Sequence, residues 1–267
     1  MNKLTWTQWL TESHPADVYL IVNVQATPSP INTLYAGDCI DEAFRLYDST
    51  PLAHIADVGF WLVRLKPAAC RELGKLMDNG VFSDPSWGWA YRSQMSLQEN
   101  LDHWRRRQIV TLDGESVVLR LGDSRIAAVL LPAMNRDDWR LLMTPVQEVL
   151  TDTPELHVFT SPVTDAPLPD PEIQQLPFEM KPHLMRAWQT SAQARLCCTE
   201  NIVCDLWEDH PETALLLDTP EGMLKQRITG WLTEETEKLT DPGSLTEADF
   251  RRYAAHQGWT AASEETE

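Results

Sequence analysis

Carboxylates are the side chains of this sequence best suited to chemistry, because two of them held together can act as general acid and general base. Asp102, Asp113, Asp123 and the adjacent Asp137 and Asp138 lie in the central part of the 267-residue chain. Asp123, with Arg125 two residues on, follows an apolar segment, and sites on sheets often lie at strand ends. Capping of the next helix by Asp123 explains the same pattern more simply. Nothing in the spacing singles out a catalytic pair.

Metal and nucleotide motifs are missing from the sequence. Cys198, Cys204 and His210 include neither a C-x-x-C pair nor a second histidine at ligand spacing. No glycine-rich phosphate loop, G-x-S-x-G elbow or H-E-x-x-H motif occurs. We therefore expect no catalytic residue, no metal and no cofactor, and we predict that the protein is not an enzyme.

The elements that would position these carboxylates are clearest between residues 87 and 145. Alternating aromatic and small residues at 87–91 predict a strand, and Ser96 with Glu99 forms the capping-box pattern of a helix start. Residues 117–121 predict a second, largely buried strand. Asp123 and Asn135 then fit as N-caps of two short helices.

Further apolar runs at 18–24, 59–65 and 156–159 predict three more strands, the first of them central in its sheet. A helix is expected to start near Pro67, and another near Trp6 and Trp9. Strands separated by helices indicate an α/β domain with a mixed sheet of about five strands and flanking helices.

The prolines at 162–182 break every periodicity and predict a linker. Beyond it the pattern is helical, with starts expected at Pro220 and, by a second capping box, at Ser244. We therefore predict two domains, an α/β domain over residues 1–165 and a smaller all-α domain over 166–267.

Charge narrows the classes of partner. The formal net charge is −18 and the pI is about 4.7, which disfavours nucleic acid and anionic lipid surfaces. The stretch Arg105, Arg106 and Arg107 fits a helix C-terminus better than a nucleic-acid patch. Residues 166–267 carry 19 acidic and 8 basic side chains, so this half is the more acidic. Solvated helix faces explain that acidity, and a docking surface for a basic or neutral protein segment is the alternative.

No apolar run is long enough to span a bilayer, and the polar, interrupted start of the chain does not fit a signal peptide. We expect a cytoplasmic protein. Its 11 tryptophans are unusual for this length, and tryptophan is frequent at binding hot spots. The aromatic residues predicted to be available to a partner, with packing between helices as the alternative, are Trp207, Trp231, Tyr253 and Trp259.

The order of several short motifs resembles a known family. The motifs are Tyr19-Leu20-Ile21-Val22, Leu34-Tyr35, Pro51-Leu52, Gly59-Phe60-Trp61-Leu62-Val63, Trp87-Gly88-Trp89, the helix with Leu97, Leu101, Trp104 and Arg105, Leu119 to Arg125, and Leu130-Leu131-Pro132. Together they resemble the adaptor or chaperone family that loads effectors onto the spike of the bacterial type VI secretion system. The resemblance covers about residues 18–145, and the motifs bear on fold, not catalysis. The sequence departs from the family pattern at Phe60 and at 122–125.

This resemblance implies a non-enzymatic, cytoplasmic protein that binds an effector, often through the effector's N-terminal segment. It also implies delivery of that effector to VgrG or to a PAAR-type spike protein. Two alternatives stay open: an immunity or inhibitor protein that binds a toxin, and a small enzyme whose carboxylates assemble only in the fold.

Overall fold

The structure is a computed structural model that describes residues 3–163, 175–236 and 245–260. The chain divides into two compact units, Met1–Leu184 and Met185–Glu267, here called unit 1 and unit 2. Unit 1 is mixed α/β and unit 2 is helical, which confirms the predicted fold class. The predicted boundary between residues 165 and 166 lies outside the described residues, as does much of the predicted linker.

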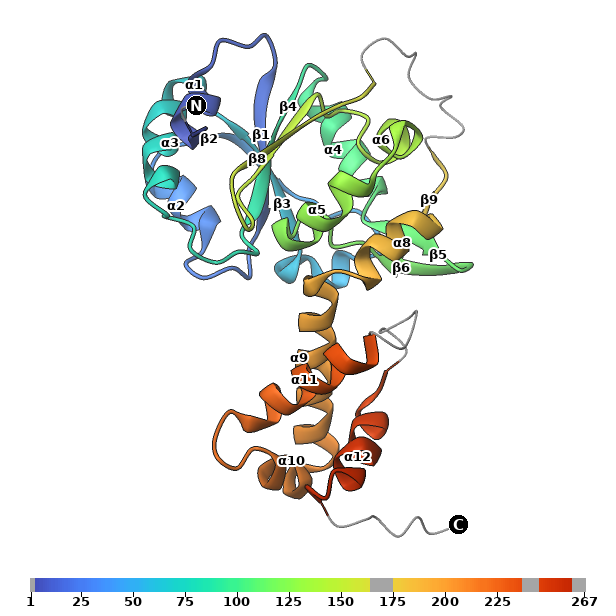
Figure 1. Ribbon diagram of the computed structural model, residues 1–267. Helices are drawn as coiled ribbons and strands as arrows, with labels where there is room; N and C mark the ends of the chain where they lie inside the picture. The colour runs from blue at the N-terminus through green and yellow to red at the C-terminus, as the bar shows by residue number, and fades with distance from the viewer. Residues whose placement is uncertain (1–2, 164–174, 237–244, 261–267) are drawn as a thin grey trace. The chain divides into compact units, whose positions relative to one another are not determined.

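The main sheet of unit 1 has six strands in the order β2-β3-β1-β4-β7-β8. Every neighbouring pair is antiparallel (Figure 1). The strands are β1 (Asp17–Asn23), β2 (Ile40–Arg45), β3 (Phe60–Leu65), β4 (Gly88–Ser93), β7 (Glu148–Thr151) and β8 (His157–Thr160). β1 lies in the middle of the sheet, as its apolar run predicts. β2 and β7 are additions to the predicted strands.

A second, three-stranded sheet contains β5 (Ile109–Leu112), β6 (Glu115–Val118) and β9 (Phe178–Glu179). Its order is β6-β5-β9, and β9 pairs with β5 in parallel. The strand predicted at 117–121 differs from the observed one in its bounds and in its sheet. The observed strand, β6, ends at Val118 and belongs to this small sheet. Leu119 and Leu121 are buried although they lie beyond the strand, and their burial accounts for the apolar pattern.

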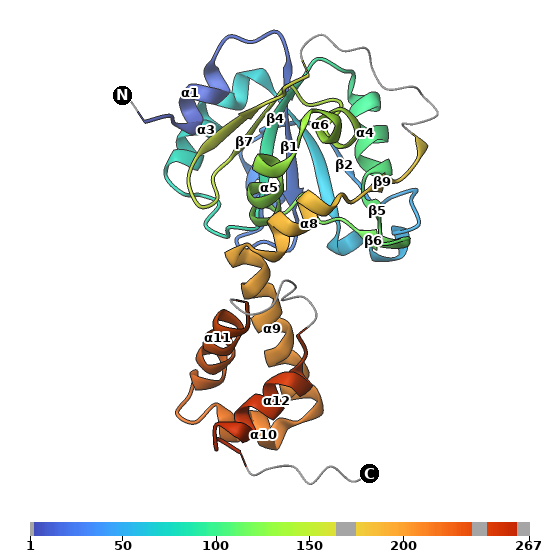
Figure 2. The same ribbon diagram turned by 45° about the vertical axis from the view of Figure 1, so that its right-hand side comes forward.

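Helices cover both faces of the main sheet (Figures 1 and 2). One face packs against α1 (Trp6–Thr11), α2 (Pro30–Ala36) and α3 (Cys70–Asp78). The other face packs against α4 (Leu97–Arg106), α5 (Ser124–Leu130) and α6 (Arg136–Leu142). Short 3₁₀ helices occupy Ala53–Val58, Pro67–Ala69 and Leu131–Ala133. The four inner strands β3, β1, β4 and β7 are largely buried, as expected for strands covered on both faces.

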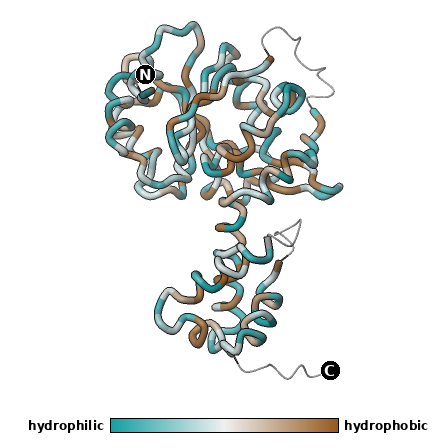
Figure 3. The backbone as a smooth tube through the Cα atoms, viewed as in Figure 1, coloured by the Kyte–Doolittle hydropathy of each residue, from teal (hydrophilic) through white to brown (hydrophobic). Residues whose placement is uncertain are grey.

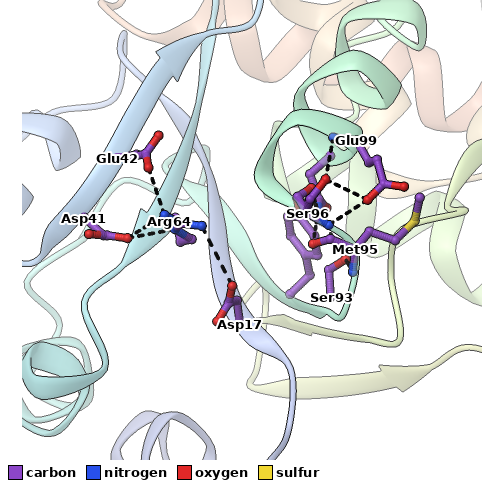
Figure 4. A network of polar contacts seen from close by, with 10 residues as sticks. Asp17, Asp41, Glu42, Arg64, Ser93, Met95, Ser96 and Glu99 are labelled. Atoms are coloured by element: carbon purple, nitrogen blue, oxygen red, sulfur yellow. Dashed lines mark hydrogen bonds and ion pairs between the residues drawn. The ribbon is translucent and has the colours of Figure 1, made fainter.

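Local capping sets the helix starts, as the sequence predicts. The Ser96 hydroxyl accepts a hydrogen bond from the Glu99 amide, and the Glu99 carboxylate accepts one from the Ser96 amide (Figure 4). Asn135 and Asp138 form the same reciprocal box at α6. Each box satisfies amides that a helix start leaves without an intrahelical partner.

Two glycines of the motifs named above allow close packing in unit 1. Gly88 has φ of +138°, and a Cβ there would lie 1.9 Å from the Ile21 carbonyl oxygen. A Cβ at Gly122 would lie 2.5 Å from the Phe60 ring. Only glycine fits at Gly88, since its backbone conformation and its space both exclude a side chain.

Unit 2 packs its helices around one apolar cluster. The helices are α9 (Ala192–Asp209), α10 (Pro211–Leu217), α11 (Met223–Thr236) and α12 (Glu247–His256). Leu206, Ile228, Trp231 and Phe250 are among its buried residues. Two predicted starts shift: α11 begins three residues after Pro220, and α12 is capped by Thr246 with Asp249. The predicted cap Ser244 lies outside the described residues.

Candidate functional site

Among the carboxylates considered for catalysis, Asp123 and Asp138 cap helices and Asp113 is exposed. Asp123 is 2% exposed and caps α5 by accepting a hydrogen bond from the Arg125 amide. The Arg125 guanidinium also donates to both Asp123 oxygens, at 2.9 and 2.6 Å. Asp113 is exposed in the turn between β5 and β6. Asp138, 3% exposed, closes the cap of α6 and contacts the His183 ring at 2.6 Å. These contacts place Asp123 and Asp138 in helix capping.

The three consecutive arginines do not form a surface patch. Arg107 is 3% exposed, and its guanidinium donates to the carbonyl oxygens of Leu141 and Leu176. Burial lowers the pKa of Arg107 to about 10, with a smaller contribution from the charge of Arg106. The Arg105 guanidinium donates to the Arg45 carbonyl. These contacts make the triplet a structural feature at the end of α4, as its position after Trp104 predicts.

Potential metal ligands are not clustered. In residues 3–163, 175–236 and 245–260, no group of three or more His, Cys, Asp or Glu side chains could hold a metal ion. Cys198 is half-buried, and burial raises the pKa of its thiol. Cys204 is exposed on α9. The His210 ring lies 3.3 Å from a Glu247 oxygen.

A buried polar network joins β4 to α4 in unit 1. The Trp104 indole donates to the Tyr91 hydroxyl, which donates to the Asn100 amide oxygen, each at 2.9 Å. The neighbouring His103 ring lies 2.9 Å from the Leu142 carbonyl oxygen, so that ring nitrogen must carry the proton. Burial lowers the pKa of His103 to about 3. The histidine is therefore neutral near pH 7 and holds α4 to α6.

The predicted partner-binding aromatics fall into two groups in unit 2. Trp231 is 3% exposed, and its ring packs on Phe250 and Tyr253. Tyr253 and Trp259 are half-buried and in edge contact. Three of the four predicted residues thus contact one another and pack between helices. Trp207, on α9, stands outside this cluster and is 42% exposed.

Two exposed leucines on α10 were missed by the sequence reasoning. Leu215 and Leu216 on α10 are 64% and 53% exposed, while Ala214 and Leu217 beside them are buried. The signal was available, because four consecutive apolar residues in a helix cannot all face one side. We call Trp207, Leu215 and Leu216 the α9–α10 surface. Figure 3 shows the hydrophobic colouring of α10.

Carboxylates surround this apolar surface in the sequence. Residues 196–224 contain seven Asp and Glu and no Lys or Arg. Asp205, Glu208, Asp209 and Glu212 are exposed on the same two helices. Charged side chains around a contact surface select partners of complementary charge.

Comparison with known proteins gives one match. Residues 18–141, somewhat under half of the chain, match a family model described as Domain of unknown function (DUF4123). No curated protein matches the chain. No solved structure matches it either. Among the helices of the described residues, none is long and apolar enough to cross a membrane.

Proposed function

We propose that this chain is a non-enzymatic adaptor or chaperone that binds a type VI secretion effector and promotes its loading onto the VgrG or PAAR spike. The observation that carries the proposal is the agreement of two spans. The resemblance to the adaptor family covers about residues 18–145, and the family match covers residues 18–141. Both spans contain most of β1 and all of β2, β3 and β4 of the main sheet, and both end before β7 and β8.

The roles of the candidate catalytic groups support a binding protein. Asp123 is enclosed by its own cap and by Arg125, and Asp113 lies on an exposed turn. Acid–base catalysis needs both groups within reach of one substrate. A protein that holds a partner needs no such pair.

The α9–α10 surface is our candidate for effector contact. Its three apolar side chains are exposed, and the nearby carboxylates favour a partner segment that is basic and apolar. Tryptophan at such a position offers a large contact area together with one hydrogen-bond donor.

Two assays in a bacterium that carries the gene test the function. Tagged full-length protein is used to capture partners from the cytoplasm, and export of the captured toxin is measured with the gene intact and deleted. We expect capture of an effector together with VgrG or a PAAR protein, and loss of export on deletion. Protection from the toxin without any effect on its export would establish an immunity protein instead.

The contact surface is tested by Trp207→Ser combined with Leu215→Ser and Leu216→Ser. Since hot-spot residues contribute about 2 kcal/mol or more each, effector affinity should fall at least about thirtyfold. Leu76→Ser in α3 is the matched control, because Leu76 is 42% exposed, as is Trp207. If the triple variant binds the effector with undiminished affinity, the α9–α10 surface is not the contact surface. The adaptor function itself would then still be decided by the capture and export assays.

A further inference from the structure

Unit 1 contains a pocket at the end of the main sheet that none of the roles above explains. Its volume is about 570 Å³, within the range of ligand pockets. It is formed by the turn after α1, the ends of β4, β7 and β8, and the end of α6. Met95, Trp139, Met143 and Val163 give it an apolar wall. Arg92 and Arg140 supply its cations.

The carboxylates of the pocket are already compensated. Arg92 is 2% exposed, and its Nη1 lies 2.9 Å from Glu12 and 3.0 Å from Glu148. Glu148 also accepts a hydrogen bond from the Trp9 indole at 2.8 Å. The Arg92 guanidinium stacks over the Trp9 ring, 4.4 Å from its centroid. Glu12, Glu148 and Arg92 thus form a closed group that fixes one wall.

Arg140 is different, because it forms no ion pair with any residue of the described chain. Its Nε is buried without a hydrogen-bond partner among these residues, and so are Gln147 Oε1 and the Nε of Arg92. Buried polar atoms without partners are rare in proteins and destabilise the fold. Arg140 is therefore a cation that lines the pocket and has no ion-pair partner among the described residues.

From this we infer that the pocket binds a carboxylate that carries an apolar neighbour, with the Arg140 guanidinium as its ion-pair partner. Guanidinium and carboxylate form short, charge-assisted hydrogen bonds. The apolar wall accommodates the neighbouring group.

The sheet edge beside the pocket indicates a peptide as the ligand. β8 is the terminal strand of the main sheet as far as the described residues go, and Thr160, Ser161 and Val163 at its end line the pocket. β8 (His157–Thr160) contains no Asp, Glu, Lys or Arg. A terminal strand presents amide and carbonyl groups to which an extended peptide can pair.

The opposite edge is protected against such pairing. β2 has a bulge between Ile40 and Glu42. Its Asp41 and Glu42 accept hydrogen bonds from Arg64 at 2.8 and 2.9 Å (Figure 4). Charges and bulges are the usual means of blocking an edge strand. The acidic peptide is therefore expected at β8, with its carboxylate in the pocket. This inference concerns unit 1 and does not depend on the function proposed for the α9–α10 surface.

The test uses full-length protein and three libraries of acetylated, amidated heptapeptides with random flanks and a fixed central Glu, Gln or Lys. Retained peptides are measured by mass spectrometry in 0.15 M salt, where the screening length is about 8 Å. We expect the Glu library to be retained about tenfold more than the Gln library, and the Lys library least. Arg140→Gln should abolish the preference for Glu. Arg136→Gln, an exposed arginine on the same helix, should leave it unchanged.

Two further measurements test whether the carboxylate belongs to a peptide and whether the Arg140→Gln variant is folded. N-acetylglutamate amide should compete at least tenfold less well than a retained Glu peptide, and N-methylation of alternate peptide amides should abolish retention. The thermal midpoint of Arg140→Gln should be no lower than that of Arg136→Gln. Equal retention of Glu and Gln peptides, no retention at all, or a preference that survives Arg140→Gln would overturn the inference. Full competition by N-acetylglutamate amide would show that the ligand of the pocket is a small acid and not a peptide, and would overturn the role of β8.

Discussion

Unit 1 and unit 2 use tryptophan differently. Of the seven tryptophans in unit 1, six are buried and Trp61 is half-buried. Of the four in unit 2, only Trp231 is buried, and Trp207 is exposed. The high tryptophan content therefore reflects aromatic packing around a sheet in one unit and an accessible side chain in the other. Composition alone does not separate these two uses, since both give the same count.

The largest expected effect is in the packing of unit 1. Gly88→Ala places a Cβ against the Ile21 carbonyl oxygen at a φ that L-residues rarely adopt, so the free energy of unfolding should fall by about 3–5 kcal/mol. Urea unfolding followed by circular dichroism measures the loss. Gly114→Ala is the control, since its φ is also positive but its Cβ meets nothing within 4 Å. Equal losses of stability in both variants would show that the positive φ alone, and not the close contact with Ile21, excludes a side chain at position 88.

The second prediction separates the two tryptophans of unit 2 that sequence reasoning treated alike. Trp231→Ala removes a core ring and should cost about 3–5 kcal/mol of stability. Trp207→Ser should change stability by less than about 0.5 kcal/mol, because its side chain is 42% exposed. Thermal unfolding of both variants measures the difference. A large loss at Trp207 would make it a core residue and remove it from the α9–α10 surface.

Sequence reasoning succeeds where structure is decided locally. The reciprocal caps of Ser96 with Glu99 and of Asn135 with Asp138 involve residues three apart, so their spacing is sufficient. β2, with the sequence IDEAFR, has no clear alternation, and its strand conformation depends on pairing with the distant β3. Such a strand cannot be read from its own residues.

The same limit applies to the candidate sites. Trp207 and Trp231 both lie on helices with apolar neighbours, and only the tertiary packing makes one exposed and the other buried. The pocket near Arg140 draws its walls from four segments of the chain, within residues 12–15, 92–95, 139–148 and 160–163. No local pattern could reveal that Arg92 is paired twice while Arg140 is unpaired, since Glu12 and Glu148 are each more than 50 residues from Arg92.

The third prediction concerns pH and unit 1. The pKa of His103 is about 3 in the fold and about 6.5 in the unfolded chain. Protons therefore bind the unfolded chain preferentially between these values, and the stability present above pH 6.5 is lost as pH falls toward 3. The expected loss is about 1.4 kcal/mol per pH unit. His103→Gln should remove this contribution, which urea unfolding at pH 7.5, 6.5 and 5.5 measures as the difference between the two proteins. Parallel curves would mean that His103 is protonated without penalty.

The smallest expected effect is in unit 2 and is a gain. Gly230 lies on the exposed side of α11, and a Cβ there meets nothing within 4 Å. Because glycine weakens a helix through backbone entropy, Gly230→Ala should stabilise unit 2 by about 0.5–1 kcal/mol. Gly222→Ala is the matched control, since its Cβ is equally free but its φ is +86°; it should destabilise. The thermal midpoint of each variant measures the sign. Compared with Gly88→Ala, these two variants show how far free space, backbone conformation and close contacts each determine the stability change of a Gly→Ala substitution. A loss of stability in Gly230→Ala would contradict the helical assignment of α11.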